Sequence, residues 1–245
     1  MKKLTLLAVS ICVLSAINVA GQTIVVTKKK TVYTRPKPIV DFKKTFVVFH
    51  PRVKAATPAL SRKIESTISY AKVMDLNIRE EIADVQWLEE ADFDVNYNSR
   101  GILVVTLTIN GSGAYPDGIS RTVVVNAKTG NRILPQDAFT DLGDLAALVK
   151  QKQKDEVERS IKELKADPEN KEIDPAELFE SSDFNIDDLK EYAVDNETVT
   201  FIYDYGFPHV IEALQPEGRF TFKWSEVERF VKPGGPFGKF VSRQQ

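Results

Sequence analysis

The sequence is poor in the residues that most often carry metal or thiol chemistry. It contains one cysteine, Cys12, and two histidines, His50 and His209, which lie far apart in the chain. A zinc site needs several such ligands at short spacings, and none of those spacings occurs. A single cysteine forms no intramolecular disulfide, so the fold must rest on a packed core. We therefore expect no metal site and no cofactor.

Motifs of known catalytic sites are also absent. Gly111-Ser112-Gly113 lacks the spacing of the Gly-x-Ser-x-Gly nucleophile elbow. Asp183 to Asp187 begins like a calcium-binding loop, but Asp188 stands where that loop needs glycine and Val194 where it needs glutamate. A turn or a helix N-cap is a better explanation of Asp183. The sequence therefore predicts that the protein is not an enzyme.

Long apolar runs are missing except at the start of the chain. Lys2 and Lys3 precede a mostly apolar stretch from Leu4 to Ile17, and the small residues of Val19-Ala20-Gly21 follow. This is the pattern of a secretory signal peptide, and its removal would leave a chain without cysteine. An uncleaved anchor is the alternative. No later segment approaches the roughly 18 apolar residues of a membrane span. We expect a periplasmic or secreted bacterial protein without a membrane span after signal removal.

The two charge signs are unevenly distributed, although the net charge is only −2. Residues 28–54 carry nine bases and one acid, whereas residues 155–191 carry fourteen acids and five bases. Such polarity can steer a charged partner onto one side of a protein, but a basic arm and a solvated acidic helix face would give the same pattern. Nucleic acid fits poorly, because the basic run contains prolines and a single interleaved aromatic residue.

The order of predicted elements divides the chain into five parts. After the signal peptide (1–21), residues 22–41 read as an extended basic leader, either a linker or an edge strand, because prolines interrupt it. An N-terminal subdomain (42–110) has a strand, an amphipathic helix over 57–82 and a hairpin. A C-terminal subdomain (111–231) has a strand, a long helix after Asp141 and a second hairpin, and a flexible tail (232–245) follows. Two similar helix-plus-hairpin subdomains predict an α+β fold, with a mainly antiparallel sheet and helices packed on it.

The second subdomain contains an ordered series of motifs. A Gly-rich loop, a β-prone segment, a tight turn and two aromatic strands follow one another at Gly111–Gly118, Thr122–Asn126, Lys128–Asn131, Val199–Gly206 and Arg219–Val227. This layout resembles the extracytoplasmic domain of the RsiV-type anti-sigma factors, which is shared with the non-catalytic part of the PdaC-type peptidoglycan deacetylases. The resemblance implies a secreted α+β recognition domain without chemistry of its own.

The resemblance also implies a class of ligand. RsiV-type domains recognise lysozyme, a cationic muramidase, and the deacetylase domain accompanies a cell-wall enzyme. We therefore expect a non-catalytic binding module for an envelope protein, lysozyme-like in charge, or for a peptidoglycan-related glycan. Two alternatives remain: a structural or assembly factor of the envelope, and a cell-wall hydrolase that uses carboxylates such as Asp117.

Two loops are the predicted ligand-binding site. Tyr115 and Asp117 lie in the Gly-rich loop, and Tyr205, Phe207 and His209 lie where a strand becomes a loop. Exposed aromatic side chains at such positions often anchor interfaces. Many members of the resembling family carry histidine where this chain has Tyr115, so a contact that depends on imidazole does not carry over.

Overall fold

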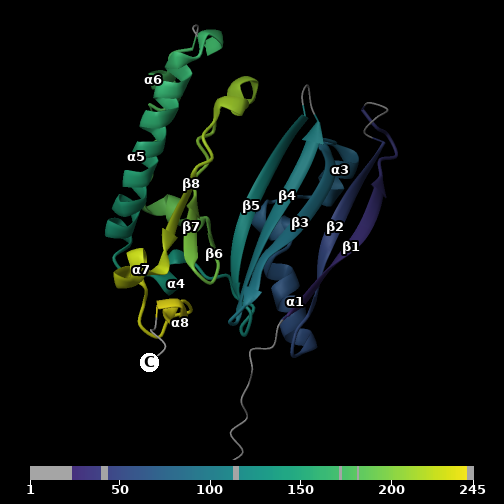
Figure 1. Ribbon diagram of the computed structural model, residues 1–245. Coiled ribbons are helices and arrows are strands. Elements are labelled where there is room, and N and C mark those ends of the chain that lie inside the picture. The colour runs from purple at the N-terminus through teal and green to yellow at the C-terminus, as the bar shows by residue number, and fades with distance from the viewer. Residues whose placement is uncertain (1–23, 40–43, 113–115, 171–172, 181, 242–245) are drawn as a thin grey trace, which may run out of the picture.

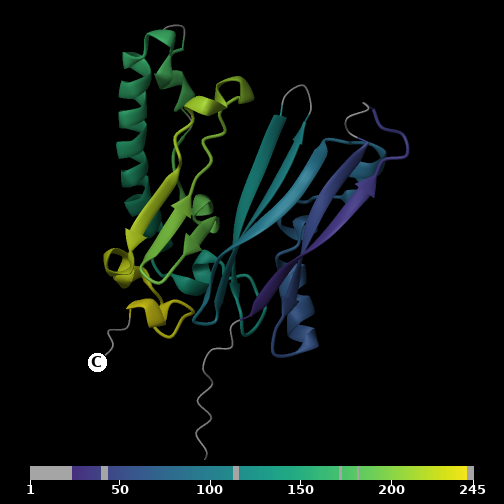
Figure 2. The same cartoon turned by 45° about the vertical axis from the view of Figure 1, so that its right-hand side comes forward.

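The computed structural model describes residues 24–39, 44–112, 116–170, 173–180 and 182–241 (Figure 1). The predicted signal peptide lies outside these residues. The described chain forms two units that lie side by side, a larger one with five strands and a smaller one with three (Figures 1 and 2).

The larger sheet consists of five strands that are neighbours in chain order: β1 (Val25–Thr34), β2 (Thr45–Lys54), β3 (Leu88–Ser99), β4 (Ile102–Ser112) and β5 (Pro116–Asn126). All pairs are antiparallel except β2–β3. This parallel pair requires a crossover, which three short helices provide: α1 (Pro58–Thr67), α2 (Tyr70–Val73) and α3 (Ile78–Ala83). They cover one face of the sheet, over an apolar core that includes Val48, Ile64 and Leu103.

The single helix predicted over 57–82 is wrong in its extent. It begins as expected, with the Thr57 hydroxyl accepting a hydrogen bond from the Leu60 amide and Pro58 in the first turn. The helix ends at Thr67, and the short α2 follows after Ile68 and Ser69. A second break comes at Asp75, which adopts a left-handed backbone conformation (φ 52°), and Asn77 then caps α3 by accepting from the Arg79 amide. Apolar residues spaced by three and four do not reveal such breaks.

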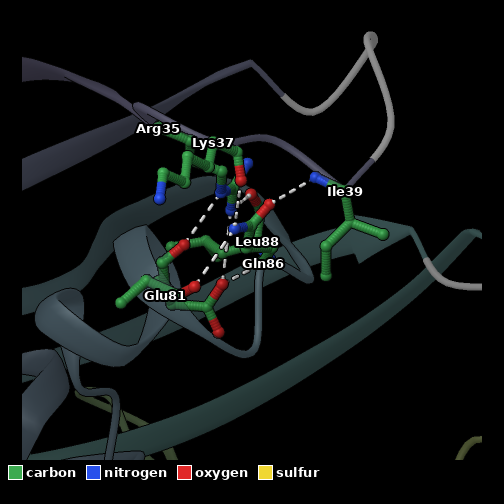
Figure 3. A network of polar contacts seen from close by, with 7 residues as sticks. Arg35, Lys37, Ile39, Glu81, Gln86 and Leu88 are labelled. Carbon is green, nitrogen blue, oxygen red and sulfur yellow. Dashed lines mark hydrogen bonds and ion pairs between the residues drawn. The ribbon is translucent and has the colours of Figure 1, made fainter.

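The predicted leader contains β1, which pairs with β2 along ten residues. Of the two interpretations, linker or edge strand, the structure has the edge strand. Pro36 and Pro38 follow the strand and do not interrupt it. The segment after β1 is fixed by a buried polar network (Figure 3).

The centre of this network is Arg35, whose exposed fraction is 1%. Its Nε donates to the Glu81 carbonyl at 2.8 Å, and its Nη2 donates to the Leu88 carbonyl at 2.7 Å and lies 3.3 Å from Glu81 Oε2. Gln86 joins the same segments, donating to the Lys37 carbonyl and accepting from the Ile39 amide. The leader is therefore tied to the segment that connects α3 with β3.

The smaller unit packs a three-stranded antiparallel sheet against one long helix. The strands are β6 (Tyr192–Val194), β7 (Thr198–Ile202) and β8 (Arg219–Lys223), and the helix is α5 (Leu142–Ala166). The predicted hairpin around residues 195–197 and the continuous helix are confirmed. The remaining elements are short: α4 (Pro135–Ala138), α6 (Pro175–Leu178), α7 (Trp224–Val227), α8 (Gly238–Val241), η2 (Pro168–Asn170), η3 (Ile186–Lys190), η4 (His209–Leu214) and η5 (Glu228–Phe230).

The described part of the predicted tail is folded onto this unit. Phe237 is fully buried, with its ring centroid 5.6 Å from that of Phe139 and 5.5 Å from that of Trp224. The Lys232 amide donates to the Ala138 carbonyl. Glycine and proline at 233–236 indicated flexibility, but the apolar rings that follow them complete the core. The predicted fold class, α+β with mainly antiparallel sheets and packed helices, is confirmed.

Candidate functional site

The two predicted ligand-binding segments lie at the same end of the molecule. The β4–β5 hairpin reaches this end from the larger sheet, and the chain between β7 and β8, which contains η4, reaches it from the smaller sheet (Figures 1 and 2). The far end of α5, followed by η2 and α6, lies there too. These three segments form the candidate surface.

Most of the predicted Gly-rich loop is strand. β4 continues to Ser112 and β5 begins at Pro116, paired with each other. Gly111 is needed because a Cβ there would lie 2.3 Å from the Trp87 carbonyl oxygen. Tyr115 lies outside the described residues. Asp117 is exposed, and its Oδ1 accepts a hydrogen bond from the Gly118 amide at 2.6 Å.

The exposure expected for Tyr205 and Phe207 is wrong. Each side chain is only 8% exposed, because α5 and α6 cover them in a small core with Leu164 and Phe179. The Tyr205 hydroxyl donates to Glu156 Oε2 at 2.8 Å. Burial, reinforced by this carboxylate, raises the pKa of Tyr205 above its usual value. Both aromatic residues hold the loop in place and do not face solvent.

The most exposed of the large apolar side chains described is one that the sequence did not single out. Val210 is 81% exposed on η4. His209 begins the same short helix, and its side chain lies outside the described part. Alternating aromatics drew attention to the preceding strand, whereas a single valine in a loop gives no signal.

A charged cluster joins the two units below this surface. Arg121 on β5 lies 3.7 Å from Glu191 and 4.0 Å from Asp204, measured between side-chain N and O atoms. The Thr122 amide donates to Glu191 Oε1 at 3.0 Å. Burial raises the pKa of Glu191, although the Thr122 amide and Arg121 lower it in part. The cluster holds the edge of β5 against the segment that leads into β6.

The open face of the larger sheet next to this cluster is polar. Thr106 Oγ1 lies 2.8 Å from Asn96 Oδ1 and 3.0 Å from Thr122 Oγ1, and Thr108 Oγ1 lies 2.9 Å from Ser120 Oγ. These side chains satisfy one another's hydrogen-bonding groups across β3, β4 and β5, as cross-strand hydroxyl pairs do.

No metal-binding group of three or more His, Cys, Asp or Glu side chains occurs among the described residues. The segment that begins like a calcium loop is explained by local contacts. Asp183 pairs with Lys150 at 2.9 Å, and hydrogen bonding and charge from Lys150 lower the pKa of that carboxyl group. The predicted N-cap is Asn185, two residues later, which accepts from the Asp187 amide.

In the part of the chain that the structure describes, no helix combines the length and apolar character that crossing a membrane requires.

The fold has relatives among solved structures. A DUF3298 family protein from Pseudomonas aeruginosa PAO1 aligns over 86% of this chain and 96% of its own, with a TM-score of 0.56 and 14% identity. A second DUF3298 family member, from Bacteroides fragilis NCTC 9343, aligns over 90% of this chain and 98% of its own, with a TM-score of 0.56 and 13% identity. Models of known protein families give no match, and neither do curated proteins. At these identities the similarity shows a common fold.

Proposed function

We propose that the protein is an exported, non-catalytic binding module of the bacterial envelope, related to the RsiV-type domains. Its proposed ligand is an envelope protein or a cell-wall glycan, and a cationic, lysozyme-like protein is the first candidate. One observation supports this most: the exposed acids after α5 lie at the same end of the molecule as the β4–β5 hairpin and η4.

The charge of this end favours a cationic partner. The segment from Asp167 to Glu180 contains six acids and one base. Five of these acids are described, and all five are exposed: Asp167, Glu169, Asp174, Glu177 and Glu180. None of the five forms an ion pair with another described residue. Unpaired charges of one sign attract an oppositely charged protein and speed its association, and salt screens this effect.

Val210 and Asp117 are the contacts that we propose beside the acids, in place of the buried Tyr205 and Phe207. An exposed apolar side chain surrounded by polar residues can form a contact from which water is excluded. Charged side chains alone do not form such a contact. Val210→Ser should therefore weaken binding by raising the dissociation rate. The association rate and folding should stay the same.

The test is calorimetric titration with lysozyme at low and at high salt. Glu177→Lys with Glu180→Lys should weaken binding about tenfold or more at low salt and much less at high salt. The matched control, Asp144→Lys with Glu228→Lys, changes the net charge equally at exposed sites near the other end of the molecule. Equal losses in both double variants, or binding that strengthens with salt, would contradict the proposal.

The non-catalytic part of the proposal has its own test. Glu191 combines a raised pKa with partial burial, and so it is the described carboxylate best suited to acid–base catalysis. Its Oε1 already accepts the Thr122 amide, and Arg121 lies beside its Oε2. We expect purified protein to leave peptidoglycan intact. Muramidase or amidase turnover that disappears in Glu191→Gln would overturn this expectation.

A further inference from the structure

A second polar site lies on the helix-covered side of the larger sheet. Here β2 and the helices α1 and α2 line a cavity of about 290 Å³ that is open to solvent. Its lining is rich in charged and hydroxyl side chains: His50, Pro51, Arg52, Arg62, Glu65, Ser66, Ser69 and Tyr70. None of these residues belongs to the candidate surface described above.

The charge of the cavity is positive. Its one acid, Glu65, is engaged, since Oε1 accepts the Val53 amide at 2.8 Å and Oε2 lies 3.5 Å from Arg52 Nη1. Arg62 is exposed on α1 and forms no ion pair with a described residue. Lys29 of β1 adds a further positive charge, because it stands opposite His50 in the β1–β2 register.

His50 is held between these charges. Its Nε2 lies 3.2 Å from the Tyr33 hydroxyl of β1. On the α2 side, the Tyr70 hydroxyl donates to the Phe49 carbonyl, which fixes that wall of the cavity. Burial lowers the pKa of His50, and the charges of Arg52 and Lys29 lower it further. If Tyr33 donates to Nε2, the hydrogen of the neutral ring is on Nδ1, which is then a donor.

We propose that this cavity binds a compact oxyanion, a phosphate or a carboxylate group of a larger ligand. Arg62 and Arg52 supply charged donors from two different elements, and Ser66 also lines the cavity. An anion here removes the repulsion that disfavours protonated His50, so binding and protonation of His50 reinforce each other. This site goes beyond the proposed function, and it can exist whether or not the acidic end binds lysozyme.

The test is an NMR titration of the untagged protein, in which the two histidines give two sets of ring signals. His209→Gln assigns the signals of His50. Sodium sulfate stands in for a phosphate ester because its charge is constant across the titration, sodium acetate represents a carboxylate, and sodium chloride at equal ionic strength is the reference. We expect the pKa of His50 to rise in sulfate, in acetate or in both, relative to chloride. The more effective anion identifies the group.

Two variants separate a site from general charge. Arg62→Ala should weaken anion binding about tenfold, because a hydrogen bond to a charged group is lost. Arg159→Ala removes an arginine that is also exposed, on α5, and should leave binding unchanged. Both arginines are on the surface, so both variants should fold. The same His50 pKa in all three salts, or equal effects of the two substitutions, would show that the cavity binds no oxyanion.

Discussion

The two units of the molecule build their cores from different side chains. Beneath α1–α3, three of the eighteen buried residues of the core are aromatic: Phe46, Tyr70 and Phe93. The core of the smaller unit also includes Tyr97, Ile102, Val104 and Val124 from strands of the larger sheet. Ten of its twenty-three buried residues are aromatic: Tyr97, Phe139, Phe184, Tyr192, Phe201, Phe220, Phe222, Trp224, Phe230 and Phe237. The first core is mainly aliphatic, whereas the second contains many contacting rings.

Strand length explains this difference. Strands of ten to twelve residues, such as β3, offer many inward positions, and β-branched and leucine side chains fill them. Strands of three to five residues offer few, so each inward side chain must bury more area. An aromatic ring buries roughly 150–250 Å², which compensates for a short strand. The aliphatic unit in turn relies on a buried polar network at its edge.

The largest effect that we predict concerns that network. Glu81→Ala removes the carboxylate that lies 3.3 Å from Nη2 of the buried Arg35, and with it the acceptor of the Leu88 amide. Breaking a buried ion pair in this way costs about 3–5 kcal/mol of unfolding free energy. Urea denaturation followed by circular dichroism measures the loss. Glu158→Ala, at an exposed position of α5, is the control and should change stability by less than about 0.5 kcal/mol. Similar values for both variants would mean that the network contributes little.

The next effect lies in the smaller unit. At Gly218 (φ +61°) an added Cβ would lie 2.0 Å from the Tyr203 carbonyl oxygen, whereas at Gly206 (φ +65°) nothing lies within 4 Å. Gly206→Ala should cost about 1–2 kcal/mol, the strain of a left-handed backbone alone. Gly218→Ala should cost more, about 3 kcal/mol, because the backbone must also move. Thermal unfolding of the two variants measures the difference, and equal melting temperatures would contradict the close approach.

A smaller effect tests the corrected role of the loop aromatics. Tyr205→Phe keeps the ring but removes the hydrogen bond to Glu156, which should lower stability by about 1 kcal/mol. Lysozyme affinity should stay as in the wild type, because the ring is buried and faces α6. Weaker binding without a loss of stability would instead place Tyr205 in the interface.

The smallest effect concerns the junction of the two units. The pKa of Glu191 is raised in the folded state, so between its unfolded pKa and this raised pKa the folded protein binds more protons than the unfolded chain. Stability contributed by this group is therefore present at low pH and decreases as pH rises through that interval. Glu191→Gln should remove this decrease. Melting temperatures measured from pH 4 to pH 7 check it, and a parallel pH profile in both proteins would refute it.

The sequence predicts what depends on local pattern. Alternation in Phe93, Val95 and Tyr97 correctly indicates a strand, but a register shift between Val95 and Tyr97 leaves Val95 exposed and places Phe93 and Tyr97 in different cores. The aspartate–asparagine turn at 195–196 correctly indicates a hairpin. The long helix is also predicted, although Lys150 to Glu156 contains no apolar residue, because its ends are apolar enough to pack.

What the sequence does not predict depends on distant segments. The burial of Tyr205 and Phe207 requires α5 and α6 to cover the loop, and residue spacing within the loop does not contain that information. The sequence left the leader as either a linker or an edge strand, because the pairing of β1 depends on β2, a separate segment of the chain. The cavity at His50 is lined by residues from a strand and two helices, and no sequence motif links these residues.

The position of β1 has a consequence for how copies of the protein meet one another. β1 is a terminal strand of its sheet, with ten residues and partly exposed Val25 and Val32. A free strand edge of this kind is a template for self-association and for amyloid-like aggregates. Three consecutive lysines, Lys28 to Lys30, occupy its middle. Two such edges brought together would place like charges opposite each other, and this repulsion disfavours pairing of β1 with a second copy.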